Sequence, residues 1–182
     1  MRIFLCWLLL MGFLFNAEAQ KKFMTNNGEI KFASKAQLEM IKASSNKLQG
    51  IIDPATNQFA FLVNIPSFQG FNSELQRKHF NENYMESEKF TMAKFSGKII
   101  EQIDYTQDQT FDVRAKGELD IHGQKQTRII KGKITIKGNQ VIIEAHFMVP
   151  LADHSISIPK IVSQKIATEI EADINTTLSR QQ

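Results

Sequence analysis

The most regular pattern of apolar and polar residues in the chain runs from Phe111 to Gly123. Charged residues alternate there with apolar or small residues, which are Phe111, Val113, Ala115, Gly117, Leu119 and Ile121. Because successive side chains of a β-strand point to opposite faces, this alternation predicts a long strand with one buried face and one face in water. His122 and Gly123 follow, and both tolerate the positive φ that a tight hairpin turn requires.

The alternation resumes after this turn and predicts the second strand of a hairpin. The residues expected to point inward are Gln126, Arg128, Ile130, Gly132, Ile134 and Ile136. The opposite face carries Lys131, Lys133 and Lys137. We interpret these lysines as a solvated face that discourages pairing with other strands, and a patch for anionic lipid is the alternative.

Shorter alternating segments on both sides of this hairpin predict further strands. Turn residues at 53–57, Pro66 and Gly138–Asn139 separate several of them. The expected strand segments are 29–34, 38–43, 47–53, 58–65, 90–100, 141–149 and 166–174. In segment 90–100 the apolar residues change phase between Met92 and Phe95, which predicts either a bulge or a strand that is buried differently at its two ends.

One segment, from about residue 72 to residue 82, predicts a helix. Ser73 and Gln76 have the spacing of a capping box, and Leu75, His79 and Phe80 form a stripe at helical spacing. We expect this helix to pack on one end of the sheet.

Roughly eight mostly antiparallel strands and a single helix predict an all-β fold, an eight-stranded antiparallel up-and-down barrel with one short helix near a barrel end. A barrel of this size either fills with side chains or holds one small ligand. The inward positions include Ala115, Gly117 and Gly132, and such small residues leave volume inside. Inward glycines also let barrel strands coil. We expect an internal cavity.

The first 19 residues have the composition of a signal peptide. Arg2 precedes an apolar run from Ile3 to Phe15, and Ala17 and Ala19 stand where a signal peptidase reads small residues. The run is shorter than the roughly 20 apolar residues of a membrane span. We therefore expect cleavage before Gln20, one domain over residues 20–182, and a secreted or periplasmic protein with no transmembrane segment after cleavage. Cys6 is the only cysteine and would leave with the signal, so we expect no disulfide.

Composition and motifs argue against several other functions. The net charge is only +3, and cations alternate with acids along the predicted strands, so we expect no nucleic-acid partner. The four histidines lack short metal-ligand spacing, so we expect no metal ion and no cofactor. The chain has no GxSxG, HExxH or phosphate-binding glycine loop, and the adjacent Asp153 and His154 are more often a loop-ordering pair than a catalytic one. We predict that the protein is not an enzyme.

Four segments resemble the YceI-like family of secreted lipid-binding proteins, in the order that the family uses. They are HFNENYMESEKF (79–90), FSGKI (95–99), KGELDIHGQKQ (116–126) and PLADHSISIPKIVSQKIATEI (150–170). The resemblance extends over about residues 32–174. It implies a lipocalin-like barrel of eight antiparallel strands with a helix near one end, enclosing a long apolar tunnel for a polyisoprenoid or fatty amphiphile. The chain departs from the family pattern at Lys78 and Thr91, on the helix and its exit.

We expect the ligand to lie inside the barrel, against the inward residues of the predicted strands. The expected apolar lining is Phe59, Phe61, Val63, Phe111, Val113, Ala115, Gly117, Ile130, Gly132, Ile134, Ile143 and Phe147. Arg128 is the inward cation nearest the Gly123 turn and is the candidate head-group contact.

Two functions fit these expectations. The first is a secreted binding protein, monomeric or oligomeric, that sequesters or carries an apolar amphiphile such as a polyisoprenoid or a fatty-acyl lipid. The alternative is a non-catalytic structural or stress-related envelope protein whose barrel is filled by its own side chains. The fourteen phenylalanines, against two tyrosines and one tryptophan, suit either function.

Overall fold

The hairpin around Gly123 forms as its alternation predicts. In the computed structural model, which describes residues 21–181, β5 (Thr110–Ile121) pairs with β6 (Gln124–Lys137) along the whole of β5. The two turn residues have positive φ, 53° at His122 and 70° at Gly123.

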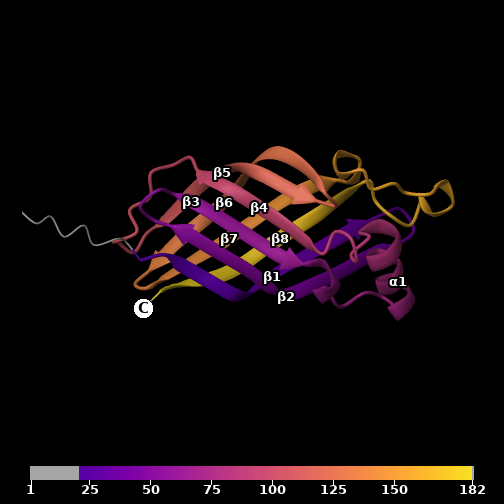
Figure 1. Cartoon of the computed structure of the whole chain (residues 1–182), viewed down its shortest axis with the longest axis horizontal. Coiled ribbons are helices and arrows are strands. Elements are labelled where there is room, and N and C mark those ends of the chain that lie inside the picture. The colour runs from indigo at the N-terminus through magenta and orange to yellow at the C-terminus, as the bar shows by residue number, and fades with distance from the viewer. Residues whose placement is uncertain (1–20, 182) are drawn as a thin grey trace, which may run out of the picture.

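This hairpin is part of a closed barrel in which every strand is antiparallel to its neighbours (Figure 1). The other strands are β1 (Phe23–Lys35), β2 (Met40–Asp53), β3 (Gln58–Asn64), β4 (Met92–Ile99), β7 (Gln140–Pro150) and β8 (Glu169–Arg180). Neighbours in sequence are neighbours in the sheet, and β1 pairs with β8 to close it. The predicted eight-stranded antiparallel barrel with one short helix is confirmed. No helix within residues 21–181 is long and apolar enough to cross a membrane.

The helix α1 (Glu74–His79) lies at one end of the barrel, and the C-terminus lies at the other (Figure 1). Ser73 caps it, because the Ser73 hydroxyl accepts a hydrogen bond from the Gln76 N–H at 3.2 Å. The Gln76 side-chain oxygen accepts in turn from the Asn72 N–H at 3.1 Å. The first bond uses one of the backbone donors that a helix start leaves free, as the predicted capping spacing requires. The second goes to the residue before the N-cap, whereas a complete capping box would return to the Ser73 N–H. The helix continues into one π-helical turn, Phe80–Tyr84.

The end of the barrel opposite α1 is filled by its own side chains. The most deeply buried members of this closed-end core are Phe23, Leu178, Val141, Ile52, Ile136 and Tyr105. Burial, and to a smaller extent the nearby Asp53 carboxylate, raises the pKa of the Tyr105 phenol. The closed-end core therefore seals this end of the barrel with apolar groups and a neutral phenol.

Three strands differ clearly from their predicted boundaries. The first strand was expected at 29–34 but runs over Phe23–Lys35. The last strand was expected at 166–174 but runs over Glu169–Arg180. Residues 166–168 belong instead to a loop fastened to β1, where the Ala167 N–H donates to Ser34 Oγ at 2.9 Å. The polar residues 175–177 hid the continuation of the strand, in which Leu178 points into the closed-end core. Segments 38–43 and 47–53 form the single strand β2, with an irregular register against β1 between Gly28 and Ile30.

The predicted phase change in β4 has a simpler cause than a bulge. Pairing of β4 with β3 runs without a register shift from Met92 to Lys98. Met92 is exposed on the outer face, whereas Phe95 and Ile99 point inward. The apolar Met92 on the solvent side therefore disturbed the pattern, and the bulge alternative was wrong.

Candidate ligand-binding cavity

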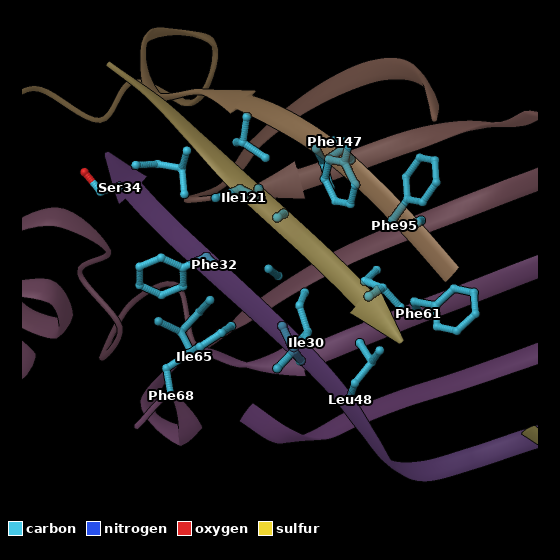
Figure 2. Close-up of a pocket in the computed structure, with 18 of the residues that line it drawn as sticks. Ile30, Phe32, Ser34, Leu48, Phe61, Ile65, Phe68, Phe95, Ile121 and Phe147 are labelled. Carbon is cyan, nitrogen blue, oxygen red and sulfur yellow. The ribbon is translucent and has the colours of Figure 1, made fainter. Parts of the chain in front are cut away.

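An apolar cavity of about 530 Å³ occupies the part of the barrel nearer α1. All eight strands contribute inward side chains to it, and α1 contributes residues at its edge. Figure 2 shows Phe32, Ile121, Phe147, Phe95 and Phe61 reaching from the surrounding strands toward the same space. The volume is within the range of about 300 to 1,000 Å³ that small-molecule sites occupy.

The cavity ends at the layer of the closed-end core that lies nearest α1, and we call this layer the floor of the cavity. Phe59, Ile99, Val113 and Ile134 are buried members of that core and also line the cavity. The Phe59 ring packs against Phe95, with ring centroids 5.0 Å apart. A ligand chain entering from the helix end would therefore stop at these side chains.

At the helix end, a cluster of aromatic rings covers part of the cavity. We call Phe32, Phe68, Phe71 and Phe80 the aromatic cover. Phe32 comes from β1, and its ring centroid is 5.2 Å from that of Phe68, 5.9 Å from that of Phe71 and 5.3 Å from that of Phe80. Glu39 fastens α1 from the β1–β2 side, because its carboxylate accepts from Gln76 Nε2 at 2.9 Å.

A second anchor joins the segment after α1 to the β5–β6 turn. His122 Nε2 lies 3.1 Å from Glu86 Oε1, and His122 Nδ1 lies 3.1 Å from the carbonyl oxygen of His154. The Phe90 ring packs edge-on against the His122 ring at 4.6 Å. Glu86 and His122 both adopt positive φ, so the anchor depends on two backbone positions that most residues disfavour. The segment that carries α1 is therefore held at both ends.

The cavity reaches solvent at this end. Exposed lining residues there include Leu75 and His79 on α1 and Lys165 in the β7–β8 connection. Tyr84 also lines the cavity, and burial raises the pKa of its phenol. The phenol is therefore a neutral hydroxyl at the edge of an otherwise apolar space.

Most of the residues predicted to line the interior do line this cavity. They are Phe59, Phe61, Val63, Val113, Ala115, Ile130, Gly132, Ile134, Ile143 and Phe147. Phe111 and Gly117 do not. Phe111 packs against the closed-end core. Gly117 pairs with Gly97 of β4, and a Cβ on Gly117 would collide with the backbone oxygen of Ser96, so this glycine permits close strand approach and adds no volume.

Arg128 already has partners within the protein. Its guanidinium donates to the Met148 carbonyl oxygen at 2.9 Å and pairs with Asp153 Oδ2 at 3.1 Å. As a head-group contact it stays a prediction, and a ligand would have to compete with these two acceptors.

Sequence reasoning missed the lining residues outside the central strands. They include Ile30 and Phe32 of β1, Leu48 of β2, Phe68, Phe71 and Phe80 around α1, and Ile156 after β7. Ile30 and Phe32 alternate on one face of their strand, which was a usable signal. Phe80 belonged to the helical stripe that was expected to pack on one end of the sheet, whereas Phe68 and Phe71 belonged to no predicted period.

The adjacent Asp153 and His154 are both engaged in holding their loop. Asp153 pairs with Arg128, and the fully buried His154 places Nδ1 3.1 Å from the Gln124 carbonyl oxygen. Within residues 21–181, no group of three or more His, Cys, Asp or Glu side chains is placed to hold a metal ion. The geometry around the cavity suits binding by burial of apolar surface.

Comparison with known proteins identifies relatives of the whole barrel. A family model described as the YceI-like domain matches residues 18–178. No curated protein gave a match to the chain.

Several solved structures share the fold at low sequence identity. A polyisoprenoid binding domain from Saccharophagus degradans, implicated in plant cell wall breakdown, superposes with a TM-score of 0.72 at 12% identity, covering 89% of this chain and 99% of that one. BcnA from Burkholderia cenocepacia gives a TM-score of 0.68 at 13% identity, with 82% and 95% covered. The YCEI protein of Campylobacter jejuni gives 0.58 at 13% identity, with 75% and 81% covered.

Proposed function

The chain belongs to the YceI-like domain family, and from that premise we propose that it binds one apolar amphiphile, a polyisoprenoid or a fatty-acyl lipid, inside its barrel. The protein would carry or sequester this lipid outside the cytoplasm. A solved relative of the same fold is described as polyisoprenoid binding, which supports this ligand class.

The observation that carries the proposal is the division of the barrel interior. One end is packed solid by the closed-end core, while the part nearer α1 is hollow and lined mostly by aliphatic and aromatic groups. A barrel that served only as a structural element would gain stability by filling this space, because lost contacts around a cavity cost free energy. The hollow half therefore favours the carrier function over the filled-barrel alternative.

The shape of the cavity favours recognition of chain length over recognition of the head group. Each methylene that leaves water contributes about 0.8 kcal/mol, and the closed-end core on one side and the aromatic cover on the other limit how many methylenes the cavity can hold. Arg128 is already engaged with Asp153 and Met148, so we do not expect it to select an anionic head group.

Export is part of the proposal and rests on the sequence of residues 1–19, which lie outside the described residues. The apolar run and the Ala17–Ala19 pair support a cleaved signal peptide. An exported carrier would take up its lipid outside the cytoplasm.

The proposal is tested by identifying what the protein carries. The full chain is expressed with its leader, purified without detergent and extracted with organic solvent, and the extract is analysed by mass spectrometry. We expect a lipid near one equivalent per chain that is absent from the extract of the same protein after delipidation and repurification. Absence of lipid, together with no uptake of added polyisoprenol or fatty acid by the delipidated protein, would contradict the proposal.

A further inference from the structure

β6 and β7 separate before they reach the helix end of the barrel. Their pairing runs from Lys137 and Gln140 to Gly132 and Ala145 and ends there. Both strands continue beyond this point, because β6 begins at Gln124 and β7 ends at Pro150. Each remains paired on its other side, β6 with β5 and β7 with β8. The backbone pairing of the closed barrel is therefore incomplete between these two strands.

Side chains bridge part of this gap in place of backbone pairing. Arg128 donates to the Met148 carbonyl oxygen, and Gln126 Nε2 donates to the Asp153 carbonyl oxygen at 2.7 Å. These bonds close the gap at the helix end. Between them and the last strand pair, the wall is formed by the edges of the two strands around residues 129–131 and 146–147.

The inward residues beside the gap are small. Gly132 pairs with Ala145, and the two flanking residues in the same row are Val113 on β5 and Ile174 on β8. A side chain could not be added at Gly132, because a Cβ there would lie 2.7 Å from the Glu144 carbonyl oxygen. Between Val113 and Ile174, the wall therefore has only backbone and one methyl group at this row.

A polar furrow on the outside of the barrel meets the cavity at the same place. Its lining includes the four inward residues of this row, which also line the cavity. The other residues of the furrow are charged or polar: Glu29, Lys31, Glu101, Asp112, Arg114, Lys131, Lys133, Glu144, His146, Asp173 and Asn175. An apolar space and a polar surface thus share one thin section of wall.

We propose that this section is a side opening of the cavity, and that the polar head group of the bound amphiphile lies in the outer furrow while its chain occupies the cavity. This inference rests on the proposed lipid-binding function and adds a place and a chemistry for the head group. The aromatic cover fills part of the helix end, and the gap beside Gly132 and Ala145 gives the apolar space a second edge, where the outward-facing Lys131 and Glu144 also line it.

The charges of the furrow define the head group that it suits. Most of its charged groups pair with one another: Lys133 with Asp112 at 3.2 Å, Arg114 with Glu101 at 2.8 Å and Lys31 with Glu29 at 2.8 Å. His146 Nδ1 lies 2.7 Å from the Asp173 carboxylate. Cations and carboxylates are nearly balanced, so the furrow has no excess positive charge to attract a pyrophosphate. It offers both donors and acceptors, which suits an uncharged hydroxyl or amide head group.

Photocrosslinking locates the head group directly. The probes are hexadecanol and palmitic acid, each with a diazirine next to the head group, bound to the delipidated full chain and activated by light. Tryptic mass spectrometry then maps the labelled residues. We expect labels on residues 129–133 and 144–147 that unlabelled hexadecanol competes away, and we expect hexadecanol to bind at least as tightly as palmitic acid.

Two results would overturn the inference, and they differ in what else they affect. Labels confined to residues 73–84 and 162–166 would place the head group at the helix end and leave the proposed lipid binding intact. Absence of saturable binding by either probe would remove the proposed function and the side opening together.

The side opening can also be tested by blocking it chemically and measuring the rate of lipid uptake. In a Cys6→Ser background, Lys131→Cys at the gap and Lys116→Cys on the outer face of β5 are each capped with a bulky maleimide. We expect the cap at position 131 to slow hexadecanol uptake several-fold and the cap at position 116 to leave it unchanged. Equal uptake rates for the two capped proteins would contradict the side opening.

Discussion

Phe80, just after α1, stacks on Phe32 of β1, with ring centroids 5.3 Å apart and ring planes inclined by 22°. This pair joins a segment that belongs to no strand to the barrel wall, directly over the cavity. Phe80 also contacts Phe71 at 5.0 Å and Phe68 at 6.0 Å. Phe80 is therefore at the centre of the aromatic cover, in contact with its three other rings.

Removing the Phe80 ring should loosen the cover without unfolding the barrel. We expect Phe80→Ala to lower the free energy of unfolding by about 2 kcal/mol, below the usual cost of a phenylalanine in a full core because Phe80 is only half-buried. We also expect faster release of a bound fatty alcohol. Urea denaturation and stopped-flow release measure the two effects.

Leu75→Ala is the matched control for this variant. Leu75 lies on the same helix, but 61% of it is exposed, so its truncation should change stability by less than about 0.5 kcal/mol. Equal losses of stability in the two variants would show that the aromatic stack has no special role in holding the cover.

Two substitutions at the floor and wall should move the preferred chain length in opposite directions. Phe59→Ala removes the largest ring at the floor and should deepen the cavity, at a cost of about 3 kcal/mol in the unliganded protein. Ala115→Phe adds a ring at a position that lines the cavity and should shorten it. Competition binding with fatty alcohols of graded length measures the optimum, and an unchanged optimum in both variants would argue against a floor at Phe59.

The Glu101 carboxylate gives a prediction about pH. It accepts hydrogen bonds from the Arg114 N–H at 2.6 Å and from Arg114 Nε at 2.8 Å, and these bonds hold its pKa below the ordinary value. A lowered folded-state pKa stabilises the fold above the pKa of the unfolded chain, about 4.3, and this contribution is lost as the pH falls through the folded-state value.

Glu101→Gln should therefore be less stable than the parent protein at neutral pH, and the two should converge in acid. Thermal melts at pH values from 7 down to 3 measure the difference. The exposed Glu88→Gln serves as the control and should follow the parent protein at every pH. A difference for Glu101→Gln that stays constant across this range would contradict the role of the charge.

The leader prediction is checked on the exported protein. Because Ala17 and Ala19 supply the small residues that a signal peptidase reads, we expect the mature chain to begin at Gln20. N-terminal sequencing or intact-mass measurement of protein from outside the cytoplasm decides this. A start well downstream of Gln20, or a retained leader, would show that the pattern was misread.

Strand alternation predicted the barrel well because each strand has one dry and one wet face. The face that Ile130, Gly132 and Ile134 share proved to be the inner one. Alternation carries no information about position along the barrel axis, which is why Phe111, at the closed end, was grouped with the lining. It also cannot distinguish a small residue that leaves space from one that allows strands to approach, as Gly117 does.

The aromatic cover and the side opening could not be predicted from the sequence. Phe68, Phe71 and Phe80 meet on Phe32 because the segment around α1 folds back onto β1, and no local period encodes these long-range contacts. The gap between β6 and β7 is equally hidden, since both strands keep their alternation beyond the last paired residues. What Arg128 contacts likewise depended on where Asp153 and Met148 lie in space.

The most direct test of the lipid-carrier account is a titration of delipidated protein with saturated alcohols and acids of increasing chain length. If the cavity takes the chain, binding should strengthen by up to about 0.8 kcal/mol for each added methylene and then stop improving once the chain fills the cavity. Alcohols and acids of equal length should bind with similar affinity. Affinity that follows the head group and ignores chain length would contradict the account, even though the barrel itself is correct.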